Sequence, residues 1–136
     1  MTGPEMTPAE VEDLRALGDI DGLILALGPG YPPDVRRAAA TSLGDLVDPR
    51  AVPPLIGILG EKEGEIRLAA VLSLAKIGDR RAVPHLAALL SDPDGDVRTA
   101  AVIALGVMGD RNAVPALTDA LADPHTRVRD AVAWAR

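Results

Sequence analysis

Three aspartates at alternating positions have the spacing with which a calcium-binding loop begins. Asp92, Asp94 and Asp96 match the first carboxylates of such a loop, which also needs a glycine at its sixth position and a glutamate at its twelfth. Gly95 comes too early for that pattern, and Ile103 stands at the twelfth position. The sequence therefore favours a turn in which an aspartate caps the following helix.

Histidine and cysteine offer little further metal chemistry. The chain has no cysteine, which excludes disulfides and thiolate ligands, and its two histidines, His85 and His125, are isolated in the sequence. A zinc or iron site needs several converging ligands. We therefore expect both histidines to lie on the surface, and we expect the protein to hold neither a metal nor a cofactor.

Two further segments resemble catalytic or phosphate-binding motifs only in part. Residues 40–44 read Ala-Thr-Ser-Leu-Gly, but a nucleophile elbow needs a strand, a turn and a helix, and Ser42 lies within a helical pattern. We expect Ser42 to be a small packing residue. Residues 28–30, Gly-Pro-Gly, lack the lysine and the serine or threonine of a phosphate loop. The sequence thus predicts that the protein is not an enzyme.

One arginine recurs in every structural unit, and two explanations compete for it. The members of this arginine column are Arg36, Arg67, Arg98 and Arg129. Aligned guanidinium groups would suit a polyanion. An aspartate column recurs equally regularly, at Asp48, Asp79 and Asp110. A bidentate arginine–carboxylate pair suits a repeated structural contact and the net charge is acidic, so we favour an Arg–Asp ladder between neighbouring repeats.

These columns exist because the sequence repeats itself. Val35, Ile66, Val97 and Val128 lie 31 residues apart, and the triplet Ala-Val-Pro recurs with the same spacing. No insertion interrupts the register, so the residues 1–136 are expected to form a single domain. Its predicted parts are a degenerate capping unit at 7–33, full units at 34–64, 65–95 and 96–126, and a partial unit at 127–136.

Each unit predicts two amphipathic helices. In the first full unit, apolar or small residues follow helical spacing over 34–46 and again over roughly 50–60. Gly78-Asp79 separates the two helices of the next unit, because glycine suits the left-handed residue that ends a helix and aspartate caps the following one. Pro53 falls in the first turn of a second helix, where its missing N–H costs little. The fold class expected is an all-α solenoid of helical hairpins, with the identical leucines, such as Leu74, in its core.

Composition narrows the function classes. Hydrophobic residues make up 48% of the chain, yet phenylalanine is absent, so the core must consist of Ala, Val, Leu and Ile. The net charge of −6 argues against general nucleic-acid binding, which depends on clustered Lys and Arg. There is no basic-then-apolar leader and no long uncharged apolar run. We expect a soluble, cytoplasmic protein that binds neither nucleic acid nor membranes.

Residues 96–117 show the repeat motif. It runs from Asp96-Val97-Arg98 through Gly109-Asp110 to Ala113-Val114-Pro115 and Leu117. This pattern resembles the HEAT-like repeats named after phycobilisome lyases, and the resemblance covers residues 34–136 well and 7–33 loosely. It departs from the family at Val47, where glycine is usual, and at Arg136, where the leucine column ends. The resemblance implies a right-handed α-solenoid.

Proteins of this kind perform several tasks. They include bilin lyases, adaptors, DNA-repair proteins and a metal-dependent hydroxylase. The hydroxylase relatives bind iron through His-Glu pairs, which neither His85 nor His125 forms, since Leu86 and Thr126 follow them. The fold alone therefore does not choose among these functions.

The columns that vary between units indicate a binding surface on the first helices. Their members are Arg37, Leu68, Thr99 and Asp130; Thr41, Leu72, Ile103 and Trp134; and Asp45, Lys76 and Val107. Helical spacing places these columns on one face, opposite the core and beside a column of alanines. In the family that the chain resembles, this helix lines the concave, partner-binding side.

The resemblance thus implies an exposed apolar strip on a concave surface. The strip comprises Leu68, Leu72, Ile103, Val107 and Trp134. The alternative is that Leu72 and Ile103 complete the packing between repeats, because single apolar residues on a surface need no special explanation.

Together these observations favour a non-catalytic interaction or scaffold module that binds a protein partner. The alternative that the family name suggests is a lyase-like component assisting the attachment of a chromophore or cofactor to an acceptor protein. DNA binding is a third, less favoured class. Helix 127–136 offers Val128 and Val132 to the core but has no following helix to pack on, so we also expect fraying or self-association through it.

Overall fold

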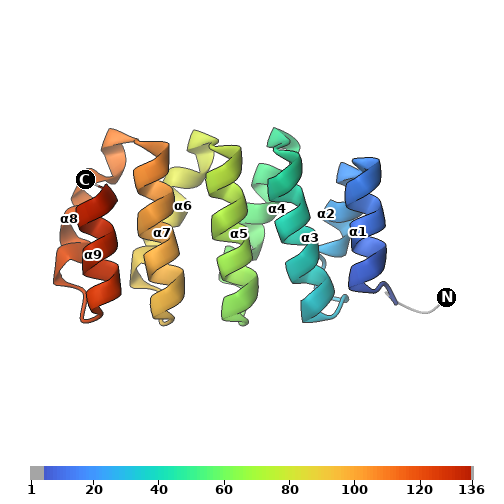
Figure 1. Ribbon diagram of the computed structural model, residues 1–136, viewed down its shortest axis with the longest axis horizontal. Helices are drawn as coiled ribbons and strands as arrows, with labels where there is room; N and C mark the ends of the chain where they lie inside the picture. Colours follow the sequence, from blue (N-terminus) through green and yellow to red (C-terminus); the bar gives the residue numbers. More distant parts are fainter. Residues whose placement is uncertain (1–4, 136) are drawn as a thin grey trace.

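The computed structural model describes residues 5–135, which form helical hairpins stacked in two layers (Figure 1). The front layer consists of α1 (Pro8–Leu17), α3 (Pro33–Leu46), α5 (Gly64–Ile77), α7 (Gly95–Met108) and α9 (Thr126–Ala135). The rear layer consists of α2 (Ile20–Ala26), α4 (Val52–Gly57), α6 (Val83–Ala88) and α8 (Val114–Asp119). Short 3₁₀ turns flank the last three of these: η1 (Pro49–Ala51), η2 (Ile58–Gly60), η3 (Arg80–Ala82), η4 (Leu89–Ser91), η5 (Arg111–Ala113) and η6 (Ala120–Ala122).

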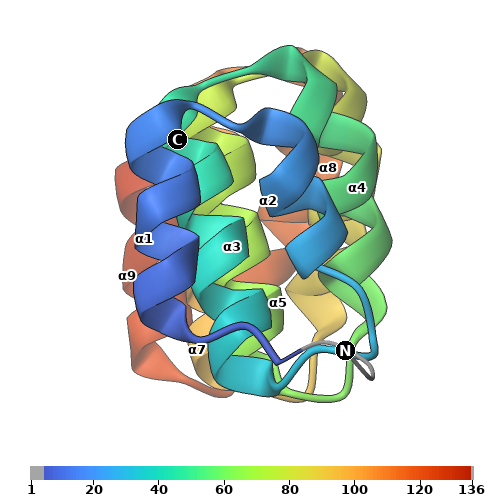
Figure 2. The same cartoon turned by 90° about the vertical axis from the view of Figure 1, so that its right-hand side faces the viewer.

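The hairpins follow one another along the long axis of the molecule. The pair α1–α2 therefore forms one end, which faces the viewer in Figure 2, and α8–α9 forms the other. Residues 5–135 contain no strand, and the predicted all-α solenoid is confirmed. The departure from the family pattern at Arg136 lies outside the described residues.

The core lies between the two layers and consists of aliphatic side chains. The identical leucine column Leu43, Leu74 and Leu105 is fully buried, as predicted. Rear helices contribute residues such as Leu55, which is equally buried. Ser42 is buried as well, in agreement with a packing role. Each Å² of apolar surface that is buried contributes roughly 25 cal/mol to the stability of the fold. This continuous apolar layer is therefore the main stabilising contribution.

Left-handed residues end the front helices, as the glycine positions predict. Gly18, Gly78 and Gly109 have φ values of 66°, 72° and 64°. Val47 takes the same role at the end of α3 with a φ of 53°, although a β-branched residue disfavours that conformation. Asp79 then accepts a hydrogen bond from the backbone N–H of Arg81, which caps the turn leading into the rear helix.

Small residues let neighbouring front helices approach closely. A Cβ atom added to Gly44 would lie 2.7 Å from the Ser73 Cα atom, so only glycine fits between α3 and α5. The Ser73 hydroxyl donates a 2.6 Å hydrogen bond to the Ala40 carbonyl, which joins the two helices. Gly106 allows the same close approach of Ala135 between α7 and α9. Small residues at these positions therefore allow the front helices to stack closely.

The last described helix, α9, packs against the core with the face that the sequence predicted. Val128 and Val132 are buried, as expected for its core face. Among residues 5–135, no helix is both long and apolar enough to cross a membrane.

Candidate protein-binding surface

Four members of the predicted surface are large apolar side chains exposed on the front layer. Leu72 on α5 is 48% exposed, Ile103 and Val107 on α7 are 40% and 59% exposed, and Trp134 on α9 is 62% exposed. We call these four residues the front strip. Helical spacing puts them on the side of each helix that faces away from the rear layer. A large part of each of these four side chains is therefore in contact with solvent.

Part of the front strip borders a groove of about 360 Å³. Leu72 and Val107 line it, together with Thr41 and Lys76, so three successive front helices contribute to one depression. Ala69, Ser73 and Ala75 complete the lining. The structure thus brings together four of the predicted site residues, and the small side chains on α5 leave the space between them open.

Charged residues border the groove. Lys76 on α5 donates a 2.7 Å hydrogen bond to the Asp45 carboxylate on α3, and both side chains are largely exposed. Arg37 and Asp130 are exposed at opposite ends of the predicted surface. A surface pair of this kind contributes little to stability, about 0–1 kcal/mol. These charges are therefore available to a partner.

Two predicted members of the surface differ from expectation. Leu68 is half-buried and packs against the core. The Thr99 hydroxyl donates a hydrogen bond to the Gly95 carbonyl within its own helix. The exposed apolar surface consequently starts at Leu72 rather than at Leu68.

The arginine column forms a ladder, but with other carboxylates than we predicted. Arg67 donates through Nε and Nη2 to Asp92, at 2.8 and 3.0 Å, and through Nη1 to the carbonyls of Glu61 and Lys62 at 2.8 Å. Arg98 repeats this arrangement one unit later, with Asp123 as its acid. Each arginine therefore joins the loop before its front helix to the loop after its rear helix.

The predicted partners Asp48, Asp79 and Asp110 were wrong for a geometric reason. They lie at the opposite end of the front helices, after the last turn, where each accepts a backbone N–H of the following 3₁₀ turn. The true acids are Glu61, Asp92 and Asp123. They too recur every 31 residues, so an acidic column 25 residues after each arginine was a signal available in the sequence. This structural use of the arginines removes the reason to assign them to a polyanion.

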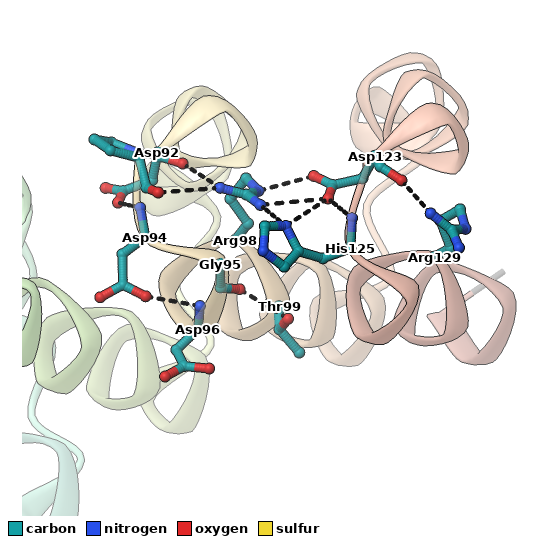
Figure 3. Close-up of polar contacts among 10 residues, drawn as sticks. Asp92, Asp94, Gly95, Asp96, Arg98, Thr99, Asp123, His125 and Arg129 are labelled. Atoms are coloured by element: carbon teal, nitrogen blue, oxygen red, sulfur yellow. Dashed lines mark hydrogen bonds and ion pairs between the residues drawn. The ribbon is translucent and has the colours of Figure 1, made fainter.

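We call each column arginine, together with the carboxylate and the loop carbonyls that it binds, a clamp. Figure 3 shows the last complete clamp, around Arg98. His125 joins it, because its Nδ1 atom lies 2.6 Å from Arg98 Nη2 and accepts a hydrogen bond there. Burial raises the pKa of the Asp123 carboxyl, but hydrogen bonds from the His125 N–H and the Arg98 guanidinium outweigh burial and hold that pKa below its ordinary value. His125 is exposed, as predicted, yet its contact with Arg98 was not foreseen.

The candidate calcium loop is a turn, as the sequence favoured. Asp94 accepts the N–H of Asp96 and caps α7, while Asp92 is occupied by Arg67. Asp96 pairs with Arg127 at 3.0 Å. Within residues 5–135, no group of three His, Asp or Glu side chains is placed to hold a metal ion.

Comparison with known families agrees with the repeated hairpins. The family model for HEAT repeats matches residues 20–106 and 86–135. The chain belongs to the HEAT repeat family. No significant match is found among curated proteins.

Solved structures place this HEAT repeat protein among helical solenoids. A chain in the complex of CpcE and CpcF of phycocyanin lyase from Nostoc sp. PCC7120 is 29% identical, with a TM-score of 0.77; the match covers 99% of this chain and 65% of that one. The HEAT repeats are therefore of the phycobilisome-lyase type, and the chain spans about two-thirds of the length of that relative.

Two more distant structures share the fold. A designed armadillo repeat protein in complex with the peptide (KR)4 is 19% identical, with a TM-score of 0.69 over 95% of this chain and 67% of that one. An engineered protein is 20% identical, with a TM-score of 0.67 over 96% of this chain and 66% of that one. Both matches concern the fold alone.

Proposed function

We propose that this HEAT repeat protein is a non-catalytic scaffold whose front layer binds a protein partner. The observation that carries the proposal is the front strip with its groove. Large apolar side chains occur there at positions that differ in polarity from repeat to repeat, whereas stacking uses the invariant columns. A gathered apolar surface with a charged border is typical of interaction sites.

The groove determines what kind of segment fits. Its apolar residues, Leu72 and Val107, suit an apolar side chain of a helix or an extended peptide, and buried anchors of this type contribute about 2 kcal/mol or more each. The Asp45–Lys76 pair at the border would fix the register of the partner rather than supply most of the affinity. The resemblance to related solenoids implies that this face is the concave one.

The comparisons support this assignment in general terms. The phycocyanin lyase structure is a complex of two proteins, and the designed armadillo repeat protein is a complex with a peptide. Solenoids use extended surfaces of stacked repeats for such binding. The HEAT repeats support an interaction scaffold in general, and the front strip supports the choice of the binding face.

A second candidate is a lyase-like role in attaching a chromophore or cofactor to an acceptor protein. The 29% identity to a chain of the phycocyanin lyase complex favours it. In this case too the front layer would engage a protein, namely the acceptor. The two candidates differ in whether a chromophore becomes covalently attached.

Site-specific cross-linking tests the binding face. A photoreactive amino acid is placed at Leu72, at Ile103 or, as a control, at His85, an exposed residue of α6 in the rear layer. The cells that naturally contain the protein are irradiated. Positions 72 and 103 should then yield a covalent adduct with the same partner protein, and position 85 should not. Adducts from position 85 alone would move the binding site to the rear layer.

The captured protein is then purified to separate the two candidates. A scaffold should form a complex of fixed stoichiometry with it in the absence of any small molecule. A lyase-like component should, when a free bilin is added, produce an acceptor whose chromophore survives denaturation. Formation of that stable adduct would overturn the non-catalytic assignment in favour of the second candidate.

A further inference from the structure

The front layer carries a group of acids near the groove. They lie in the first turns of α5 and α7 or directly before these helices, and we call them the acid edge: Glu63, Glu65, Asp94 and Asp96. Glu65 and Asp96 are exposed, and Glu63 and Asp94 are half-buried. Figure 3 shows Asp94 and Asp96 next to one another at the start of α7. Negative charge therefore lies at one end of the same two helices that carry Leu72, Ile103 and Val107.

The bases around the acid edge leave most of its charge unpaired. Asp96 pairs with Arg127 at 3.0 Å, but both side chains are largely exposed, so this pair contributes little and can open for a partner. The other three acids form no ion pair with any residue from 5 to 135. Arg37 and Lys62 are exposed on neighbouring segments but lie beyond ion-pair distance of these acids. The arginines of the two nearest clamps are already bound to carboxylates of their own.

Helix stability does not account for the acid edge as a whole. A negative charge in a first turn interacts favourably with the helix dipole, and Asp94 also caps α7. Glu63 holds the same position before α5, yet it makes no capping hydrogen bond, and one of its carboxylate oxygens is buried without a donor from residues 5–135. Arg127 occupies the position of Glu65 and Asp96 in α9, so the fold accepts a base there.

The acid edge and the groove lie on one face of the front helices at a fixed separation. Leu72 follows Glu65 by about two helical turns, so both side chains leave α5 on the same side, about 10 Å apart along the helix. On α7, Val107 and Asp96 are about three turns, or about 16 Å, apart on one side. An extended chain covers these distances in about three to five residues. One short segment can therefore reach both features.

We propose that the partner segment bound at the front strip is extended and basic. Its apolar side chain enters the groove, and a lysine or arginine about three to five residues away lies on the acid edge. This inference rests on the proposed function and adds the charge of the partner to it. The apolar anchor supplies most of the affinity, while opposite charges select the partner and speed its encounter. An acidic segment with the same anchor would be repelled.

Peptide selection on the full chain tests the charge of the segment. A display library of random short peptides is selected on the immobilised wild type. The peptides obtained are then measured against the acid-edge variant, Glu65→Lys with Asp96→Lys. The control variant, Asp21→Lys with Asp119→Lys, makes the same change of net charge at exposed positions of the rear helices α2 and α8.

The selected peptides should share one pattern, an apolar residue with a lysine or arginine about three to five residues away. Their affinity, measured by fluorescence anisotropy, should fall about tenfold or more for the acid-edge variant, folded by circular dichroism, because the charges would then repel. It should stay unchanged for the control variant. Raising the salt concentration should weaken binding to the wild type, a measurement that needs no variant.

The outcomes separate this inference from the proposed function. Peptides that need Leu72 and Ile103 but carry no excess of basic residues, or that bind the acid-edge variant at full affinity, would overturn the inference alone. Peptides that bind equally well to Leu72→Ser with Ile103→Ser, or a library that yields no binder, would overturn both. Selected sequences that match a segment of this chain would overturn the inference in favour of a second copy as the occupant.

Discussion

Leu72 and Leu74 are the same residue type, two positions apart on α5, and they differ completely in solvent exposure. Leu74 is fully buried in the column that is leucine in every full unit, whereas Leu72 is 48% exposed in a column that contains Thr41 and Ile103. The stacked fold requires the first leucine at its position, since the neighbouring repeats close around it. It does not require the second.

The difference shows that one helix holds both residues that the fold requires and residues that the fold only tolerates. Identity between repeats marks the side chains that the fold needs, and change of polarity between repeats marks those that the fold tolerates. A single exposed apolar residue needs no explanation, but several of them grouped at tolerant positions, as in the front strip, call for one outside the fold. The predictions below test this contrast from its strongest consequence to its weakest.

Truncating the buried leucine should have the largest effect. Leu74→Ala should lower the free energy of unfolding by about 2–5 kcal/mol, because it removes buried methyl groups and leaves a cavity. Leu72→Ala, the matched control, should cost less than about 1 kcal/mol. Chemical denaturation followed by circular dichroism gives both values. Equal losses would show that the two faces do not differ in burial.

Removing an acid of the arginine clamps should come next. Asp92→Ala should cost about 1.5–3 kcal/mol, since hydrogen bonds to charged groups contribute that much and Arg67 would lose its partner. Asp79→Ala removes only a cap and should cost about 1 kcal/mol. The same denaturation experiment compares the two, and a larger loss for Asp79 would restore the original assignment of the ladder.

Acid should weaken the last complete clamp. The pKa of Asp123 lies below its ordinary value in the folded chain, so its contribution is fully present above the unfolded pKa of about 4 and is lost as pH falls through the folded pKa. The stability difference between wild type and Asp123→Asn should therefore shrink below about pH 4. Urea titrations at a series of pH values measure it, and a difference that grows as pH falls would contradict this sign.

The smallest expected effect concerns Val47. Its left-handed conformation is unfavourable for a β-branched residue, so Val47→Gly should raise the free energy of unfolding by about 0.5–1 kcal/mol. The reverse change at an equivalent position, Gly78→Val, should be destabilising. A calorimetric midpoint that falls for Val47→Gly would mean that its side chain contributes packing we have not recognised.

The fold could be predicted from the sequence because its determinants are local and repeated. Spacing of 31 residues, the Gly-Asp breaks and the identical leucines predict each hairpin without reference to distant contacts. The partners of the arginines could not be chosen by recurrence alone, since the Asp79 and Asp92 columns repeat equally well. Which acid meets Arg67 depends on the loop that packs beside the first turn of α5, and the structure identifies that loop as the one carrying Asp92.

The candidate surface was predictable to a similar extent. Helical spacing identified the face that carries Leu72, Ile103 and Val107. It could not determine that Leu68 packs against the core, because helical spacing gives the face of a side chain and not the neighbours that cover it. The contact of Arg98 on α7 with His125, in the loop before α9, left no recurring signal, since Glu63 and Asp94 occupy the same column as His125.

The central claim, that the front strip is exposed for binding rather than for stacking, is tested most directly by one double variant. Leu72→Ser with Ile103→Ser should keep the free energy of unfolding within about 1 kcal/mol of the wild type, as expected for surface changes. Its affinity for the partner that cross-linking identifies, measured by titration calorimetry, should fall by about a hundredfold or more, since each apolar anchor contributes about 2 kcal/mol. Leu25→Ser, at an exposed leucine of α2, should leave both quantities unchanged. A double variant that unfolds, or one that folds and binds at full affinity, would contradict the claim.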